Sequence, residues 1–408
     1  MKAGTRVQLS AMMFLEFFVW GAWYSTIGVY MSANGMGDLT HWPYTMNAIA
    51  AIIAPFFVGL IADRFFSTEK VLATLHLVGA VLMFTAPMAV QHPLLFILLL
   101  LGYNICYMPT MSLANTLVFH TISNGEKQFP SIRVFGTLGW IAAGLGISFI
   151  LGRFTADGLE PEQTALPLYL TAAASLLLGI YAFTLPHVPP PAAGKSVSAR
   201  SILGIDALKQ LGSPSFYVFL VSSLLICIPL STYYAYTQIY LEAAEFEYIA
   251  ATQTVGQMSE IFFMLLMPLL FSRFGVKWML AIGMFAWVLR YALFALGAPD
   301  ATMWMILSGI VLHGICYDFF FVTGQIYIDK KASPEIRGQA QGLIVFVTYG
   351  VGMFIGTQVA GLIYNGFLEE AQSLSLDKWQ DFWLVPAGIA FTVMIIFILT
   401  FREKIKIR

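Results

Sequence analysis

The chain has 408 residues, of which 59% are hydrophobic and only 11% are charged, and its formal net charge is −1. A soluble protein of this size does not need so much apolar surface, whereas a membrane protein with many spans does. The near-zero net charge gives no electrostatic reason to expect binding to nucleic acid.

Twelve apolar runs follow one another along the chain, and each is long enough to cross a bilayer core of about 30 Å, which takes about 20 residues. We expect membrane-spanning helices at residues 8–32, 43–65, 70–90, 93–119, 131–152, 166–185, 214–240, 249–272, 276–297, 301–325, 338–366 and 381–401. The first run is too long for a signal-peptide core, so we interpret it as a retained span. The three cysteines, Cys106, Cys227 and Cys316, lie in apolar runs and are expected to be free, buried thiols.

The longest polar stretch, residues 186–213, separates six runs from six. It contains three consecutive prolines followed by Gly, Ser and basic residues, a composition typical of a linker. The sequence therefore predicts an all-α integral membrane protein with a six-helix bundle at 1–185, a linker at 186–213 and a second six-helix bundle at 214–408. One short surface helix is expected around Ile205–Leu211.

Basic residues gather on one side of the predicted membrane. With twelve spans both termini share a side, and that side collects seventeen Lys and Arg residues, whereas the other side receives only Arg153 and Lys378. The positive-inside rule makes the first side, with both termini, cytoplasmic.

The two halves also repeat weakly. Pro130-Ser131-Ile132-Arg133 opens the fifth span, and Pro334-Glu335-Ile336-Arg337 precedes the eleventh, 204 residues later. Repeated halves of six spans are the sequence sign of a transporter with a site between its halves.

A polar stripe enters the eighth predicted span. Gln253, Gln257 and Glu260 fall on one narrow helical face. An ionisable group at bilayer depth costs at least roughly 2.5–3.5 kcal/mol, so it usually faces a partner or a wet cavity. We favour a binding site here over the alternative of a polar contact between two helices.

Two other spans carry similar stripes. Arg133, Thr137 and Trp140 share a face of the fifth span. The Arg guanidinium and the Thr hydroxyl can hydrogen-bond the edge of a flat polar ring, and the Trp indole can stack on its face. Arg133 alone could instead reach towards the interface. His313 and Tyr317 share a face of the tenth span, where a ligand contact and a satisfied interhelical hydrogen bond are equally good interpretations.

Three acids lie inside predicted spans and are candidates for proton coupling: Glu260, Asp318 and Glu16. Burial disfavours their charged forms. Glu260 is slightly favoured because it is central and shares the face of Gln257, Asp318 is the rival, and Glu16 is third. Arg290, near the outer end of the ninth span, is expected to reach the interface or to pair with an acid.

Several kinds of enzyme are not indicated. The sequence has no phosphate-binding loop after a strand, no metal-ligand spacing and no nucleophile elbow. We therefore expect no enzymatic activity, no cofactor and no metal. Without a nucleotide site, uphill transport would need an ion gradient, and one proton crossing 100 mV supplies about 2.3 kcal/mol.

The chain resembles a known family. Gly59-x-x-x-Asp63-Arg64, between the second and third spans, looks like the signature of the major facilitator superfamily. More narrowly, the chain resembles the nucleoside:proton symporters, which include bacterial nucleoside and xanthosine permeases. The stretches that carry this resemblance are Tyr107–Thr110, Asn115–Thr116, Phe129–Arg133 with Gly136–Thr137, Thr184–His187, Gln257–Glu260, Trp287–Arg290, Asp318–Phe320 and Ser333–Arg337.

The resemblance implies a nucleoside and protons as ligands, a central cavity, the lipid bilayer of the bacterial inner membrane and no obligatory protein partner. It implies roles in recognition or coupling for the positions of Arg133, Thr137, Gln257, Glu260, Tyr317 and Asp318, and an aromatic at Trp140. The chain departs from the family at Glu16, where Gln is usual, and at His313, where Tyr is usual. Transport of a sugar or other small polar solute, and a membrane sensor that moves nothing, are the alternative functions.

Overall fold

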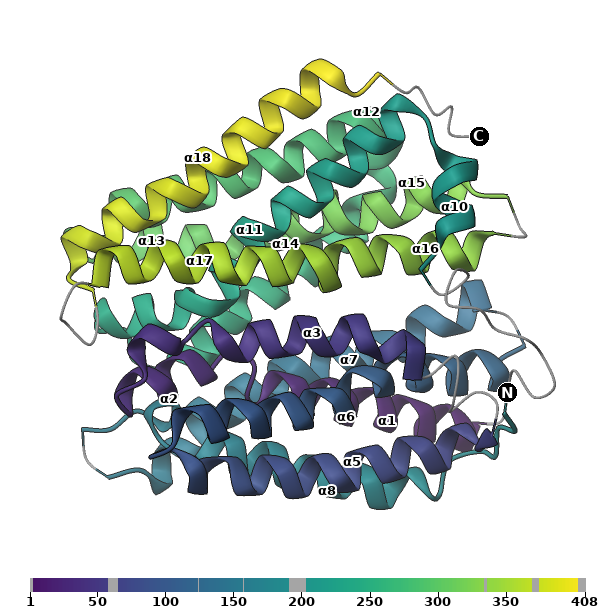
Figure 1. The fold of residues 1–408 in the computed structure, drawn as a ribbon, viewed down its shortest axis with the longest axis horizontal. Helices are drawn as coiled ribbons and strands as arrows, with labels where there is room; N and C mark the ends of the chain where they lie inside the picture. The colour runs from purple at the N-terminus through teal and green to yellow at the C-terminus, as the bar shows by residue number, and fades with distance from the viewer. Residues whose placement is uncertain are drawn as a thin grey trace. The chain divides into compact units, whose positions relative to one another are not determined.

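The computed structural model describes residues 3–57, 65–123, 125–156, 158–190, 203–333, 336–368 and 374–402. The chain forms two compact helical units (Figure 1). Unit 1 comprises Met1–Met36 and Trp42–Ala199, and unit 2 comprises Gly37–His41 and Arg200–Arg408.

Unit 1 is a bundle of long helices joined by short turns. Its α-helices are α1 (Ala3–Gly21), α2 (Ile27–Ala33), α3 (Trp42–Phe57), α5 (Thr68–Thr85), α6 (Pro93–Thr121), α7 (Gly125–Phe149) and α8 (Leu166–Ala182). Three 3₁₀ turns accompany them: η3 (Ala86–Ala89), η4 (Leu151–Phe154) and η5 (Pro161–Gln163). Helix α1 packs against α7 and α8, and α5 packs against α6 and α8. Their shared core contains the fully buried side chains of Met12, Leu72, Leu117, Ile132 and Leu178.

Unit 2 is also helical, and several of its segments depart locally from α geometry. It contains η1 (Gly37–Leu39), α10 (Ile205–Leu211), α11 (Pro214–Ala243), α12 (Ile249–Gly297), α13 (Met303–Val311), α14 (His313–Tyr317), η6 (Asp318–Val322), α15 (Thr323–Lys331), α16 (Arg337–Val345), η7 (Phe346–Gly352), α17 (Met353–Leu368) and α18 (Leu376–Thr400). Segments η6 and η7 are π-helical. Such wide turns inside α-helices occur frequently at functional sites.

Each of the twelve predicted spans overlaps helical segments of the described chain, and residues 58–64 of the second span lie outside the described residues. Eight helices there are long and apolar enough to cross a membrane, and α8 is a shorter apolar helix. The expected eighth and ninth spans are the two arms of α12, which meet at Gly275 with φ 69° and ψ 178°. A positive φ of this size is readily adopted by glycine, so the chain turns there without a separate loop.

The predicted linker contains the helix that the sequence indicated. Helix α10 has the expected bounds, but it packs against α16 in unit 2 and is not an isolated surface helix. Gly204 precedes it with φ 66°, and a Cβ there would lie 2.9 Å from both Leu343 Cβ and the Gln339 carbonyl oxygen. Residues 191–202 lie outside the described residues. All three cysteines are free and buried, as predicted.

The segment Gly37–His41 packs within unit 2 although it lies between two helices of unit 1 in the sequence. Asn365 Nδ2 in α17 donates to the carbonyl of Asp38 at 2.9 Å. The His41 ring lies where a Cβ on Gly361 would be. Burial lowers the pKa of His41 to about 4, although the charge of Asp38 acts in the opposite direction. The imidazole is therefore neutral at neutral pH.

Close helix packing in unit 1 depends on small residues, as is usual in membrane bundles. A Cβ on Gly139 of α7 would overlap the backbone carbonyl of Phe14 in α1. A Cβ on Gly146, two turns further along α7, would have no neighbouring atom within 4 Å. Replacing either glycine by alanine therefore has the same effect on helix propensity, but only the change at Gly139 disturbs the packing between helices.

We predict that Gly139→Ala lowers the thermal unfolding midpoint of the detergent-purified protein, because the backbone of α1 must move, and overpacking costs about 1–3 kcal/mol. Gly146→Ala is the control, and it should leave the midpoint unchanged or raise it slightly, since Ala favours helix over Gly. Equal midpoints for the two variants would contradict the tight contact between α1 and α7.

Candidate substrate and proton site

Aromatic side chains of unit 1 cluster around Trp20 in α1. Its ring centre lies 5.4 Å from that of Trp140 in α7, 5.4 Å from that of Tyr24 and 6.0 Å from that of Tyr107 in α6. The Trp20 and Trp140 rings meet edge to face at 75°. Trp140 is half-buried, so part of its ring is open to a ligand. Edge-to-face packing fixes its orientation.

Arg133 and Thr137 lie on α7 on the same side as Trp140, and both are half-buried. The Arg133 guanidinium carbon lies 4.0 Å from the centre of the Phe17 ring, which is a cation–π contact with α1. Arg133 is therefore held against α1 by an aromatic face and is not simply extended towards the interface. The structure brings Arg133 and the aromatic cluster onto the same pair of helices, α1 and α7.

Glu16 lies inside unit 1 and is fully buried. Its Oε2 is 3.0 Å from Nε2 of His76 in α5, and Thr110 in α6 donates to its Oε1 at 2.5 Å. On the other side of the ring, His76 Nδ1 is 3.0 Å from Ser175 Oγ in α8. This hydrogen-bonded network joins four helices, α1, α5, α6 and α8. Ser175 Oγ also lies 3.0 Å from the carbonyl of His76. The ring and the backbone of His76 therefore both contact Ser175, which fixes the edge of the imidazole that faces Glu16.

The predicted stripe on α12 is divided between two environments. Gln253 is buried, and its Oε1 accepts a hydrogen bond from Gln238 Nε2 in α11 at 2.7 Å. This contact is the polar helix-to-helix bond that the sequence left open as an alternative. Gln257 is also buried, but no described residue donates to its Oε1. A buried acceptor without a donor is available to a hydroxyl or amino group of a ligand.

Glu260 and His313 lie close together. Glu260 Oε2 is 3.9 Å from His313 Nε2, and the Glu260 side chain is 16% exposed whereas that of His313 is 1% exposed. No described residue bonds to His313 Nδ1. The imidazole ring packs on Tyr233 at 5.1 Å and on Tyr317 at 5.9 Å between ring centres.

Ser259 and Gly314 explain why α12 and α14 approach so closely. Helix α13 ends at Val311, and the carbonyls of Val311 and Gly256, at 2.6 and 2.7 Å, share the single hydroxyl proton of Ser259. The Ser259 Oγ also accepts from the Gly314 backbone N–H at 3.0 Å. A Cβ on Gly314 would lie 2.6 Å from the backbone of Ser259. The hydroxyl thus satisfies backbone groups at the break between α13 and α14, and this contact sets Glu260 beside His313.

Asp318 begins the π-helical segment η6 and is fully buried. No described residue gives a hydrogen bond to either of its carboxyl oxygens. Asp318 lies one helical turn after Gly314, whose backbone N–H contacts Ser259, the neighbour of Glu260. A buried carboxyl group without a partner is costly in an apolar bundle. Tyr317, one residue earlier, is half-buried, and its hydroxyl hydrogen-bonds that of Tyr349 in η7.

The expectation that Arg290 reaches the interface or pairs with an acid is wrong. Arg290 is fully buried, and in the described part of the chain no carboxylate pairs with it. Its Nε donates to the Gly309 carbonyl at 3.0 Å, and its guanidinium carbon lies 4.1 Å from the Tyr233 ring centre and 4.7 Å from that of Trp287. Two aromatic faces replace the acid as partners of this cation.

The sequence missed partners that come from distant helices. His76 was not singled out, because nothing near it in the sequence shows that it meets Glu16, 60 residues earlier. Tyr349 and Tyr233 were not chosen either, although a count of aromatics on each span face could have drawn attention to them. Gly59, Asp63 and Arg64 lie outside the described residues, as does Pro334 of the second repeat motif.

Apolar helices that enclose carboxyl groups, a buried Arg and half-exposed aromatic rings define an integral membrane transporter. Solved structures agree: a crystal structure of a mutant of the nucleoside transporter NupG matches with a TM-score of 0.88 and 29% identity, covering 98% of this chain and all of that one. This match confirms the expected major facilitator fold.

Sequence comparison gives the family. The model of the nucleoside H⁺ symporter family matches residues 3–406, and the chain belongs to this family. YegT of Escherichia coli (strain K12), which carries the name of a putative nucleoside transporter, is 40% identical over 98% of this chain and 94% of its own length. The xanthosine permease of the same organism is 31% identical over 98% of both chains. The resemblance stated from the sequence is confirmed, and the family consists of transporters, not enzymes.

We predict that His76→Ala destabilises the purified protein, because Glu16 loses a buried hydrogen-bond partner inside the bundle. A buried polar group left without its partner costs about 1–3 kcal/mol, and more when it is charged. His120→Ala, at an exposed position near the end of α6, is the control and should change stability by less than about 0.5 kcal/mol. Thermal unfolding in detergent measures both, and equal midpoints would show that the network contributes nothing to stability.

Proposed function

We propose that this protein is a proton-coupled symporter that imports nucleosides by alternating access. Its family membership, with relatives named as a xanthosine permease and a nucleoside permease, supports the substrate class. The observation that carries the coupling is the buried carboxyl of Asp318, which has no hydrogen-bond partner among the described residues.

The substrate contacts follow from the chemistry of each group. A ribose presents adjacent hydroxyl donors, and the open acceptor of Gln257 and the carboxyl of Glu260 can receive them. A nucleobase is flat with a polar edge, so in unit 1 we assign it to the face of Trp140 and to the donors of Arg133 and Thr137. In unit 2, Tyr317 offers a further aromatic ring on the helix segment that carries His313. His313 is held beside Glu260 and adds one more polar edge to this site.

Gln253 takes a different role within this proposal. Because Gln238 already donates to its Oε1, we assign Gln253 to positioning α12 and not to direct substrate contact. Its Nε2 can still make a weaker contact with the substrate, so replacing Gln253 should lower nucleoside affinity less than replacing Gln257.

We predict that Gln257→Ala weakens nucleoside binding about tenfold or more, because a buried hydroxyl of the substrate would lose its acceptor at a cost of roughly 1–3 kcal/mol. Isothermal titration calorimetry on the purified protein measures this affinity. Met258→Ala is the matched control, since Met258 is the next residue of α12 and is 43% exposed. Unchanged affinity for Gln257→Ala would reject the assignment.

We also propose that the coupled proton belongs to Glu260 and Asp318 together. Two nearby carboxyl groups release protons as a pair, and the charge of one opposes ionisation of the other. Glu260 is the member that touches the substrate side, so its protonation can change nucleoside affinity directly, as coupling requires. Glu16 remains a third candidate, but both of its carboxyl oxygens already have partners, His76 and Thr110.

Neutral replacements distinguish these acids. We predict that Glu260→Gln and Asp318→Asn abolish accumulation of nucleoside driven by a pH gradient and keep some nucleoside exchange without a gradient. Glu16→Gln should still accumulate nucleoside. The assay is uptake and counterflow in proteoliposomes. Accumulation by both Glu260→Gln and Asp318→Asn would contradict the assignment, as would its loss in Glu16→Gln alone.

The membrane placement is part of the same proposal. The structure and family describe a multi-pass membrane protein. The excess of Lys and Arg on one side supports cytoplasmic termini in a bacterial inner membrane. Labelling of single cysteines introduced at Met1 and Arg408 should occur only from the cytoplasmic side.

A further inference from the structure

The hydroxyl groups of two tyrosines join irregular segments of unit 2. Tyr317 ends α14 and directly precedes the π-helical η6, and Tyr349 lies inside the π-helical η7. Their hydroxyls hydrogen-bond each other across 32 residues of sequence. Tyr317 belongs to the proposed substrate site, whereas Tyr349 is not among the residues assigned to substrate or proton.

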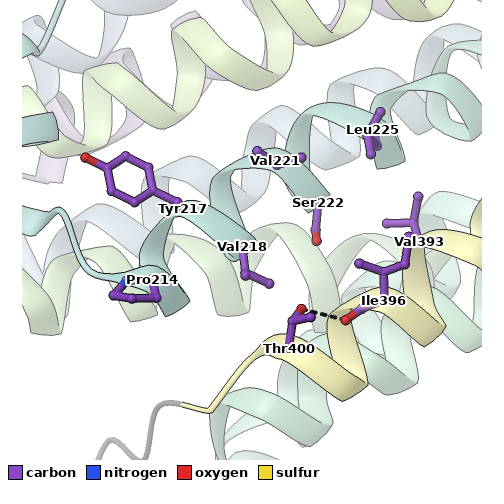
Figure 2. Close-up of a pocket in the computed structure, with 9 residues that line it drawn as sticks. All are labelled: Pro214, Tyr217, Val218, Val221, Ser222, Leu225, Val393, Ile396 and Thr400. Atoms are coloured by element: carbon purple, nitrogen blue, oxygen red, sulfur yellow. Dashed lines mark hydrogen bonds between the residues drawn. The ribbon is translucent and has the colours of Figure 1, made fainter.

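Helix α11 supports the segment that carries Tyr349. Near its start α11 lines an apolar groove together with α18 (Figure 2), and further along it packs against η7 and α17. A Cβ on Gly352, the last residue of η7, would lie 2.9 Å from Cys227 Sγ in α11. A Cβ on Gly356, in the first turn of α17, would lie 2.6 Å from Ser231 Oγ in α11. Since neither glycine has room for a side chain, η7 lies directly against α11, which supports the backbone of Tyr349.

The ring of Tyr317 packs against two other aromatic rings. Its centre lies 5.9 Å from that of His313, with the ring planes 30° apart, and 5.3 Å from that of Phe321. Tyr317 is half-buried, so part of the space around it is open and ring packing alone does not select one side-chain rotamer. The hydrogen bond at the far end of the ring favours the observed rotamer, because any other would carry the Tyr317 hydroxyl out of range of Tyr349.

The two hydroxyls contribute orientation more than stability. A hydroxyl inside an apolar bundle is costly unless it is bonded, and here each hydroxyl provides a partner for the other. Phenylalanine at both positions would keep both rings and remove both polar groups, a change that is nearly neutral for stability. The hydroxyl pair is therefore best explained by what it orients, which is the ring of Tyr317 beside His313.

We propose that Tyr349 is a positioning residue for nucleoside recognition, and that its hydroxyl holds the ring of Tyr317 in the orientation that contacts the substrate. This role rests on the proposed function, in which Tyr317 is an aromatic contact of the nucleoside. Tyr349 itself acts only through Tyr317. A contact residue that is already held in its bound orientation binds a ligand more tightly, because less freedom is lost when the ligand arrives.

The hydroxyl contact is tested by a double-mutant cycle. Isothermal titration calorimetry on the purified protein measures affinity for adenosine, uridine and xanthosine, and the nucleoside that binds most tightly is used for the variants. Tyr349→Phe removes one oxygen and should weaken affinity about threefold, because Tyr317 then spreads over roughly three staggered rotamers. In a protein that already carries Tyr317→Phe, the same change should have no further effect, since the hydrogen bond is already absent.

Tyr364→Phe is the matched control for the loss of a hydroxyl. Tyr364 is fully buried in α17, and no described residue bonds to its hydroxyl, so this change should leave nucleoside affinity unaltered. Wild-type affinity in Tyr349→Phe, or the same loss with and without Tyr317→Phe, would overturn the positioning role.

Thermal unfolding separates this role from a structural one. The variant that carries Tyr317→Phe and Tyr349→Phe together should unfold close to the wild-type midpoint. A lowered midpoint with unchanged affinity for Tyr349→Phe would make the contact purely structural and would also overturn the positioning role. If the wild-type protein bound none of the three nucleosides, the proposed transport function itself would be rejected, so the two failures are distinguishable.

Discussion

A carboxyl group inside a bundle of apolar helices must either find a partner or give up its charge, and the two units of this chain meet that constraint differently. In unit 1, both carboxyl oxygens of Glu16 have hydrogen-bond partners, His76 and Thr110. In unit 2, Asp318 is equally buried but receives no hydrogen bond from a described residue. The bonded Glu16 stabilises the bundle of unit 1. The charge of Asp318 depends instead on whether it binds a proton or moves to a new partner.

The local irregularities of unit 2 follow from the same constraint. A hydroxyl at Ser259 satisfies the backbone where α13 ends, and the absence of a side chain at Gly314 lets α12 come close enough to set Glu260 beside His313. The π-helical turns then carry Asp318 and Tyr349, both of which would be placed differently by an unbroken α-helix. Regular helices would satisfy every backbone group more simply, so these departures are best explained by the polar groups they position.

Sequence patterns predicted the spans well, because about 20 apolar residues are needed to cross a bilayer whatever the tertiary contacts are. They also drew attention to Arg133, Gln257, Glu260 and Asp318, since polar groups at bilayer depth are conspicuous, and the roles of these residues stay predictions. What they could not supply were pairings between helices. His76 with Glu16, and Arg290 with Tyr233 and Trp287, are set by how helices rotate against one another, and one sequence carries no direct record of that rotation. The same limit explains why Gln253 looked like a ligand contact although Gln238 occupies its acceptor.

The central claim is that proton movement drives nucleoside movement through this protein. The most direct measurement is uptake of radiolabelled nucleoside into proteoliposomes that contain the purified protein, with and without an imposed pH gradient. We predict accumulation above the external concentration when protons flow inward, and equilibration without accumulation when the gradient is collapsed by a protonophore. Equal uptake under both conditions would contradict coupling, and absence of any protein-dependent uptake would contradict nucleoside transport itself.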